Sequence, residues 1–199
     1  MSSKGRPKAD GTRTVLPPSE YYSTPDWCTD LLLEQPEIKE LLESRDISLL
    51  EPCAGSGAIV DVINSAYHHM WDMVELRQEE RAGLELLAST YRNSSEAFCP
   101  LSFFDFSVPY TYDAVITNPP FSLFESFLEK SLGHSDVVIM LLRQGILGSE
   151  KRHDFWQRHR PMQLLMSRRP SFTNDGKTDS SYYSWFCWGL GKQGAYRVI

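Results

Sequence analysis

Short apolar runs alternate with amphipathic stretches along most of the chain, and this pattern predicts the fold. The runs have the length of buried strands, whereas the stretches between them carry apolar residues at helical spacing. We expect strands at 47–52, 71–76, 112–117, 136–142, 163–166 and 182–188, with a further strand ending near 102–106. We expect helices at 25–34, 36–43, 79–91, 122–128 and 148–159, and another beginning at 58–63. This alternation predicts an α/β fold with helices on both faces of one sheet.

The motif Asn118-Pro119-Pro120-Phe121 stands where the strand at 112–117 gives way to the helix at 122–128. Open α/β sheets bind ligands at such strand ends. The two prolines remove two amide donors, so the Asn118 side chain and the proline carbonyls are free to act as acceptors beside the flat ring of Phe121. We therefore predict a site that holds the NH2 group of a planar heterocycle. An ordinary strand-to-helix turn is the alternative.

A glycine turn, 53–57, follows the strand at 47–52 and precedes the helix that begins at Ala58. Strand, Gly-x-Gly turn and helix together are typical of a nucleotide-binding βαβ unit, although the third glycine of the dinucleotide fingerprint is missing. Glu51, just before the turn, fits a cationic ligand. Glu75 lies about 20 residues past the turn, where a carboxylate accepts hydrogen bonds from ribose hydroxyls; a surface carboxylate is the alternative.

Other candidate ligand contacts stand at element ends. Asp105 is placed to accept a hydrogen bond from an adenine amino group, with Phe106 beside the ring, although Asp is also a common turn residue. Thr24 is expected to be the N-cap of the first helix and Pro25 its first residue. Tyr22, just before that helix, is free to lie over a ligand.

Charge is unevenly distributed in this chain of 199 residues with a net charge of −6. The stretch 143–169 is basic, and it predicts a phosphate-binding surface or, alternatively, a solvated helix face. Residues 1–20 form a polar, basic N-terminal arm in which Lys4 to Lys8 resembles the Gly-Arg-Pro core of minor-groove binders; a solvated tail is the alternative.

Composition limits the class of protein. The four cysteines have no CxxC spacing, so we expect reduced thiols and neither a zinc site nor disulfides. Apolar runs are too short to span a membrane, and no signal peptide is recognisable. We therefore expect no membrane association, no metal and a cytoplasmic location, which is the host cytoplasm if the protein is viral.

The motifs taken in order resemble those of S-adenosylmethionine-dependent amino-methyltransferases, and more narrowly the bacteriophage-type DNA N6-adenine methyltransferases. The resemblance covers residues 21 to about 190. It rests on Tyr22-x-Thr24-Pro25, Glu51-Pro52-Cys53-Ala54-Gly55-Ser56-Gly57, Glu75, Asp105, Asn118-Pro119-Pro120-Phe121 and the run from Arg169 to Asp179. It implies a class I methyltransferase fold, a Rossmann-like seven-stranded mixed sheet whose last hairpin carries one antiparallel strand, with residues 21–199 as a single domain.

The resemblance also implies roles for individual residues. The cofactor would be S-adenosylmethionine, covered by Tyr22, Thr24 and Pro25. Its methionine half would lie on Glu51, Pro52, Cys53, Ala54, Gly55 and Gly57, its ribose on Glu75, and its adenine on Asp105 and Phe106. The target base would be held by Asn118, Pro119, Pro120 and Phe121, with Phe172 on its other side; a core aromatic is the alternative for Phe172. Independently of the resemblance, the basic charge of the stretch 143–169 predicts that Arg143, Lys151, Arg152 and Arg169 hold phosphates.

Under this resemblance the substrate is a flipped adenine in DNA, read with short or relaxed sequence specificity because few residues remain for a recognition domain. A homodimer or a separate recognition partner stays open. The same motifs are compatible with methylation of adenine or guanine amines in RNA or of protein glutamine. A non-catalytic binding subunit with this fold and a Rossmann oxidoreductase are the alternatives from other classes.

Overall fold

The computed structural model describes residues 21–44, 46–91, 95–172 and 179–199. The expected arm at 1–20 and most of the polar loop after Phe172 lie outside these ranges. The α-helices are α1 (Asp26–Leu33), α2 (Pro36–Leu42), α3 (Ala58–Tyr67), α4 (Arg81–Thr90), α5 (Phe124–Ser131) and α6 (His153–Arg158). The strands are β1 (Ser48–Glu51), β2 (Met70–Val74), β3 (Glu96–Phe98), β4 (Ala114–Thr117), β5 (Val138–Arg143), β6 (Met162–Leu165), β7 (Tyr183–Trp188) and β8 (Tyr196–Val198). Short 3-10 turns are η1 (Gln78–Glu80), η2 (Phe103–Asp105), η3 (Gln144–Leu147) and η4 (Glu150–Arg152).

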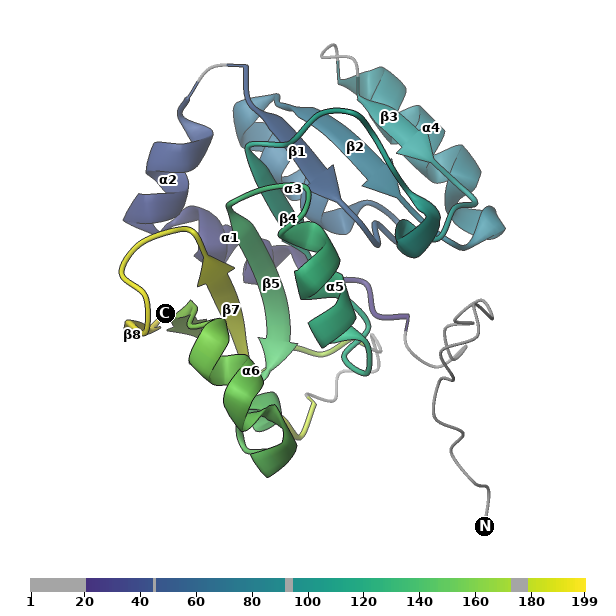
Figure 1. Cartoon of the computed structure of the whole chain (residues 1–199). Helices are drawn as coiled ribbons and strands as arrows, with labels where there is room; N and C mark the ends of the chain where they lie inside the picture. The colour runs from purple at the N-terminus through teal and green to yellow at the C-terminus, as the bar shows by residue number, and fades with distance from the viewer. Residues whose placement is uncertain (1–20, 45, 92–94, 173–178) are drawn as a thin grey trace, which may run out of the picture.

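The strands form one mixed sheet in the order β3-β2-β1-β4-β5-β7-β6-β8 (Figure 1). Strands β1 to β5 are parallel to one another, whereas β7 is antiparallel to both of its neighbours, β5 and β6. The aromatic strand near the C-terminus is therefore the antiparallel one, as expected. The chain leaves β1 toward β2 on one side, and β4 lies on the other, so the sheet has a topological switch point between β1 and β4.

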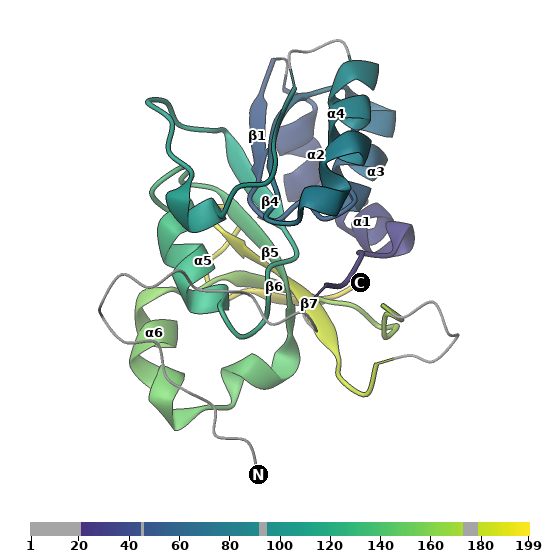
Figure 2. The same ribbon diagram turned by 90° about the vertical axis from the view of Figure 1, so that its right-hand side faces the viewer.

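Helices cover both faces of this sheet. Helices α1 to α4 lie on one face, and α5 and α6 lie on the other (Figure 2). The alternation of side chains along β5 shows the division, because Ile139 and Leu141 pack in the core beneath the first group and Val138, Met140 and Leu142 pack beneath the second. With both faces buried, the ligand-accessible part of the sheet is its edge at the strand ends.

The start of α1 differs from the prediction. Pro25, not Thr24, occupies the N-cap position, and no side chain caps the helix. Thr24 is buried, and its hydroxyl instead accepts a hydrogen bond from the Asn118 side chain at 3.1 Å. The hydrogen bond from Asn118, at the end of β4, therefore takes the place of the helix cap that Thr24 was expected to form.

The third strand is also placed differently. It covers only Glu96–Phe98, and the aromatic run expected to end it forms the 3-10 turn η2. The side chain of Ser102 accepts a hydrogen bond from the Phe104 amide and starts this turn. Phe103 and Phe106 are both buried in the core beneath α5. The aromatic run is therefore buried although it forms a turn and not a strand.

Two other elements depart from expectation. The expected basic helix at 148–159 is split into η4 and α6, although Phe155 and Trp156 do pack inward against Phe124. Strand β8 was not predicted, so the sheet has eight strands rather than seven. Its three residues are exposed. The sequence therefore lacks the buried apolar side chains by which a strand is recognised.

Candidate ligand pocket at the switch point

A pocket opens at the carboxyl ends of β1, β2 and β4, beside the switch point of the sheet. Ligands of open α/β sheets bind at such a place. The pocket lining comes from five separate segments: Tyr21–Thr24, Glu51–Ser56 with Ala58 and Ile59, Glu75–Arg77, Leu101–Phe104, and Asn118 and Pro120 with Phe127. The structure therefore brings the glycine turn, Glu75 and Asn118 together around one cavity.

The glycine turn needs its glycines for two different reasons. Gly55 has a φ of +53°, and a Cβ there would stand 3.4 Å from the Tyr21 ring. Gly57 has a φ of +81°, which favours glycine, and a Cβ there would stand 2.4 Å from the end of the Leu87 side chain on α4, which would have to shift. Gly55 lines the pocket, whereas Gly57 supports it from behind.

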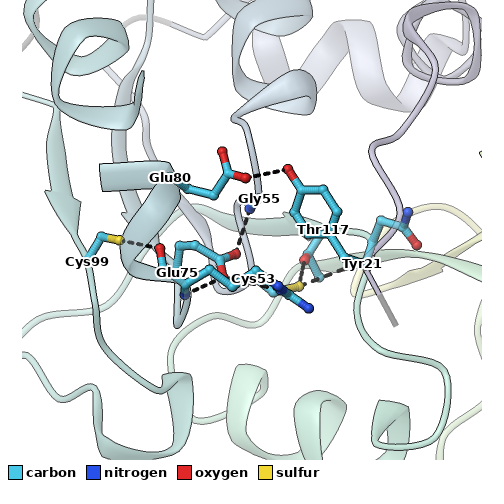
Figure 3. Close-up of polar contacts among 9 residues, drawn as sticks. Tyr21, Cys53, Gly55, Glu75, Glu80, Cys99 and Thr117 are labelled. Carbon is cyan, nitrogen blue, oxygen red and sulfur yellow. Dashed lines mark hydrogen bonds and ion pairs between the residues drawn. The ribbon is translucent and has the colours of Figure 1, made fainter. Parts of the chain in front are cut away.

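Glu75 lies directly after β2 and is almost fully buried. One carboxylate oxygen accepts from the Gly55 amide at 2.8 Å, and the other accepts from the Arg77 amide at 2.8 Å (Figure 3). The Arg77 guanidinium adds an ion pair at 3.3 Å. Glu75 thus joins the end of β2 to the glycine turn and places its side chain at the pocket wall.

Glu51 is the second buried carboxylate of the pocket. The residue is 2% exposed, and its Oε2 atom has no hydrogen-bond partner among the residues that the structure describes. Burial raises the pKa of Glu51 well above its usual range, and the charge of Glu75 raises it further. A buried carboxyl group without a partner is costly, and a cation bound in the pocket would relieve that cost.

Cys53, next in the glycine turn, is a structural thiol. Its sulfur lies 2.9 Å from the Thr117 hydroxyl and 3.4 Å from the Asn118 carbonyl (Figure 3). Burial raises its pKa well above the usual range, so it is not an activated nucleophile. It links the end of β1 to the end of β4. Pro52 and Ala54 line the pocket on either side of it.

Tyr21 covers the glycine turn and was not predicted as a site residue. Its hydroxyl donates to Glu80 at 2.7 Å, and Arg77 stacks on its ring at 4.7 Å (Figure 3). Burial and the bond to Glu80 raise the pKa of Tyr21 to about 12, so the phenol stays neutral. The sequence marked Tyr22 as the cover, and nothing in the local pattern distinguishes the two adjacent tyrosines.

Asn118 directly follows β4, and β1 lies between β4 and β2, the strand that Glu75 follows. The Asn118 side chain has a fixed orientation. Its side-chain nitrogen donates to the Tyr22 carbonyl at 3.3 Å and to the Thr24 hydroxyl at 3.1 Å. Because a carbonyl only accepts hydrogen bonds, the group that faces Tyr22 must be the NH2 end of the amide. The amide oxygen is then the remaining polar atom of this side chain. Pro119 is buried, and the Pro120 carbonyl closes a turn to the Leu123 amide at 2.9 Å.

Aromatic rings gather beyond Asn118. Tyr22 lies nearly parallel to Phe121 with ring centroids 6.0 Å apart, and it also contacts Phe172 at 5.5 Å. Tyr183 touches both Phe121 and Phe172, at 5.6 and 5.1 Å. Phe172 and Phe121 therefore share two aromatic neighbours, Tyr22 and Tyr183. Pro25 is half-buried at the start of α1.

Another part of the pocket wall is made by η2. Phe103 and Phe104 line the pocket, whereas Asp105 is exposed and Phe106 is buried in the core. Lys130 holds this turn by donating to the carbonyls of Phe104 and Phe106 at 3.0 and 2.8 Å. Phe103 and Phe104 were missed because the run was read with strand alternation rather than the spacing of a 3-10 turn.

The basic residues expected to hold phosphates have different surroundings. Lys151 is exposed. Arg152 pairs with Glu125 at 2.6 Å and stacks on Phe124 at 5.1 Å. Arg169 is exposed and lies over the Tyr182 ring at 5.8 Å. Arg143 is engaged by Asp179 and Tyr183, as described below. Lys151 and Arg169 are thus the members of this set that the described structure leaves open to a partner.

Within the described residues, no group of three or more His, Cys, Asp or Glu side chains is arranged to hold a metal ion. No helix in those same ranges is long and apolar enough to cross a membrane.

Solved structures share this fold. A protein of Listeria monocytogenes, proposed to be a class I S-adenosylmethionine-dependent methyltransferase, matches with a TM-score of 0.68 and 11% identity over 94% of this chain and 68% of that one. A proposed RNA methyltransferase of Pyrococcus horikoshii matches with a TM-score of 0.67 and 18% identity over 87% and 89%. A dimethyladenosine transferase of Plasmodium falciparum matches with a TM-score of 0.61 and 10% identity over 85% and 63%. No protein-family model and no curated protein matches the sequence.

At these identities the likeness establishes the architecture. The chain has the Rossmann-like fold of class I methyltransferases. This is the fold class that the sequence predicts, with one additional strand at the sheet edge.

Proposed function

We propose that the protein transfers a methyl group from S-adenosylmethionine to the N6 amino group of adenine in DNA. The observation that carries the proposal is that one pocket is lined both by the glycine turn with its two buried carboxylates and by Asn118 of the Asn-Pro-Pro-Phe motif. The first set suits a cationic nucleoside. The second suits an exocyclic amine.

The residues around the glycine turn fit the proposed cofactor. S-adenosylmethionine supplies a methyl group on a positively charged sulfur and carries an ammonium group. Glu51 has an unpartnered buried oxygen at the pocket wall, which a cation would satisfy. Glu75 is fixed by two backbone amides and is the proposed acceptor for ribose hydroxyls. The η2 rings, Phe103 and Phe104, offer apolar surface for the adenine, with Asp105 proposed to reach its amino group.

Asn118 and the Pro119 carbonyl are the proposed acceptors for the target amine. An adenine amino group is a weak nucleophile because its lone pair is delocalised into the ring. Two acceptors that bind its two hydrogens steer the nitrogen toward sp³ geometry and aim the lone pair at the methyl carbon. As the new N–C bond forms, the S–C bond breaks, and the proton that the amine loses passes along these acceptors to water. Positioning and electrostatics then account for most of the rate.

A paired adenine cannot reach this pocket, so the base must be flipped out of a duplex at a cost of a few kcal/mol. Stacking on an aromatic ring recovers about 1–3 kcal/mol per base. Phe121 is the proposed stacking ring, and Phe172 closes the other side. Because Tyr22 lies parallel to Phe121 at 6.0 Å, the incoming base enters beside or in place of the Tyr22 ring.

The proposal is tested by incubating the full chain with labelled S-adenosylmethionine and unmethylated DNA, followed by nucleoside analysis. We expect N6-methyladenine. Parallel reactions with unmodified RNA and with a release-factor-like protein separate the proposal from its nearest alternatives. Label in RNA or protein alone would overturn the DNA assignment, and failure to bind the cofactor would overturn the enzyme assignment.

Methylation of an amine in RNA is the second candidate. It is favoured by the likeness to the proposed RNA methyltransferase, which spans 89% of that chain. The preference for DNA rests on the resemblance of the motifs at 22–25, 51–57 and 118–121, with the run after Arg169, to the bacteriophage-type enzymes. Recognition partners and the cytoplasmic location belong to the same proposal.

Glu51 predicts a pH dependence of cofactor binding. Its raised pKa in the free protein means that the carboxyl binds a proton at a pH where an ordinary Glu, with a pKa of about 4.3, is ionised. A bound cation favours the carboxylate, so binding releases that proton. Affinity for S-adenosylmethionine should therefore fall as pH falls through the raised pKa, by up to about tenfold per pH unit for one proton. Calorimetric titration at several values between about pH 5 and 7 measures this pH dependence of affinity. In that range the α-amino group of S-adenosylmethionine stays charged.

Glu51→Gln should flatten this dependence, whereas Glu79→Gln, on the exposed side of η1, should not. The other titratable groups that bear on Glu51 are Glu75 and Cys53. If Glu51→Gln leaves the slope unchanged, the proton belongs to another group and the proposed contact is wrong.

A further inference from the structure

Three polar side chains form a closed network at the end of β5, outside the cofactor pocket. Arg143 ends β5 and is paired with Tyr183 across the antiparallel ladder. Its Nε donates to the Tyr183 hydroxyl at 2.7 Å, and its Nη2 donates to Asp179 at 3.1 Å. The Tyr183 hydroxyl donates to the same Asp179 oxygen at 2.6 Å. Each group therefore contacts both of the others, and we call the set the Asp179 triad.

The triad is built into the fold rather than spread on its surface. Tyr183 is fully buried, and the Arg143 and Asp179 side chains are 35% and 21% exposed. The Asp179 amide also donates to the Pro170 carbonyl at 2.9 Å, which ties the segment after β6 to the segment before β7. Ion pairs of this burial with shared hydrogen bonds hold their geometry better than exposed pairs.

Asp179 remains ionised in this network. Burial acts to raise its pKa, but the hydrogen bonds from Tyr183 and the Ser181 amide and the charge of Arg143 outweigh it, so the pKa of Asp179 is lowered. The pairing with Arg143 is consequently maintained across the neutral pH range.

The guanidinium of Arg143 links the triad to the base-binding motif. It stacks over the Phe121 ring with its carbon 4.8 Å from the centroid. Phe121 itself lies on the connection between β4 and α5 and is half-buried, so its ring depends on neighbours for its orientation. Arg143 and Tyr183 supply two of those contacts. Two of the five Arg143 N–H donors are already committed inside the protein.

We propose that Asp179 is a positioning residue that acts through Arg143 to fix the plane of the Phe121 ring for the target base. This inference rests on the proposed function and deepens it, because it assigns Arg143 to the stacking ring rather than to a phosphate. Stacking on a ring that already holds its bound orientation costs less ordering than stacking on a mobile one. The Asp179 triad therefore contributes to substrate binding without touching the substrate.

The test is a double-variant cycle read as KM for unmethylated DNA. Asp179→Asn keeps the shape but removes the charge, and we expect it to raise KM about tenfold, within the range of one stacking interaction, with the cofactor Kd unchanged. In a Phe121→Ala background the same substitution should add almost nothing, because its effect passes through the ring. Asp179→Glu should restore part of the wild-type KM.

Glu37→Gln is the matched control. It breaks another arginine–carboxylate pair, Glu37 with Arg197 at 2.8 Å, on α2 and β8 away from the pocket. It should leave KM unchanged. Additive effects of Asp179→Asn and Phe121→Ala, or an equal rise in cofactor Kd, would overturn the inference, since a direct phosphate contact or general unfolding gives those results.

A second measurement keeps the inference separate from the proposed function. The protein is labelled with fluorinated phenylalanine, and the ¹⁹F signal of Phe121 is assigned with Phe121→Leu. In Asp179→Asn this signal should narrow and shift toward an averaged value, because the ring is no longer held in one orientation. If wild-type protein methylates neither DNA nor RNA, the proposed function fails while this signal still reports on the triad. An unchanged Phe121 signal would refute the positioning role even if methylation is observed.

Discussion

Asn118→Ala should lower the rate of methyl transfer by about 10²- to 10³-fold, the usual loss when one stabilising group of a transition state is removed. The physical reason is that the variant lacks the side-chain oxygen proposed to bind the target amine. Single-turnover rates with saturating S-adenosylmethionine measure the effect. The cofactor Kd should change much less, because the proposed cofactor contacts, Glu51 and Glu75, belong to other segments of the pocket lining.

Asn118 also anchors the segment before α1, so this anchoring must be separated from catalysis. Thr24→Val removes one partner of the Asn118 amide but keeps the oxygen in place, and its rate loss should be far smaller. Asn118→Asp retains an acceptor and loses the donors to Tyr22 and Thr24. Its loss of methyl-transfer rate should therefore lie between those of Thr24→Val and Asn118→Ala. Near-normal turnover of Asn118→Ala would refute the proposed mechanism.

Glu75→Gln should weaken S-adenosylmethionine binding about 10²-fold. Hydrogen bonds to a charged group contribute about 1.5–3 kcal/mol each, and both oxygens of Glu75 already accept from backbone amides, those of Gly55 and Arg77. A glutamine has one oxygen and one nitrogen, and the nitrogen cannot accept a hydrogen bond from a backbone amide. The variant therefore loses one of the bonds that hold the glycine turn or Arg77, together with the proposed ribose contact. Equilibrium binding of the cofactor measures the change.

Thermal unfolding of Glu75→Gln distinguishes a loss of cofactor contacts from a loss of folded structure. A lost charge-assisted bond should cost about 1–3 kcal/mol of unfolding free energy and leave a folded protein with weak binding. Glu79→Gln, on the exposed side of η1, serves as the control for charge. Cofactor affinity within twofold of wild type in Glu75→Gln would exclude the assigned role.

The sequence predicts those parts of the molecule whose signals are local. The strand before the glycine turn and the strand before Asn118 are apolar runs bounded by Gly and Pro, and both are found where expected, at β1 and β4. Since parallel strands end at one edge, the meeting of Glu51, Glu75 and Asn118 at that edge follows from the order of elements alone.

The parts that sequence reasoning missed depend on partners distant in the chain. Thr24 is a good cap by composition, yet Asn118 engages its hydroxyl from 94 residues away. Arg143 and Arg152 were assigned to phosphates by charge, yet each has a carboxylate partner inside the protein, Asp179 and Glu125. Such pairings leave no periodic trace in the sequence. The run at 103–106 was misread because aromatic residues favour strands on average.

The reversed direction of β7 has a consequence for how the chain is divided. Because β7 runs backward, its first residue, Tyr183, reaches the edge where β5 ends, and the late part of the chain thereby joins the surroundings of Phe121. Residues up to η2 furnish most of the wall around the glycine turn, while those from β4 onward, together with Tyr22, furnish the rings beyond Asn118. Natural variation in the second half that keeps the contact with Tyr22 could therefore change the amine that the proposed enzyme accepts while the glycine turn stays unaltered.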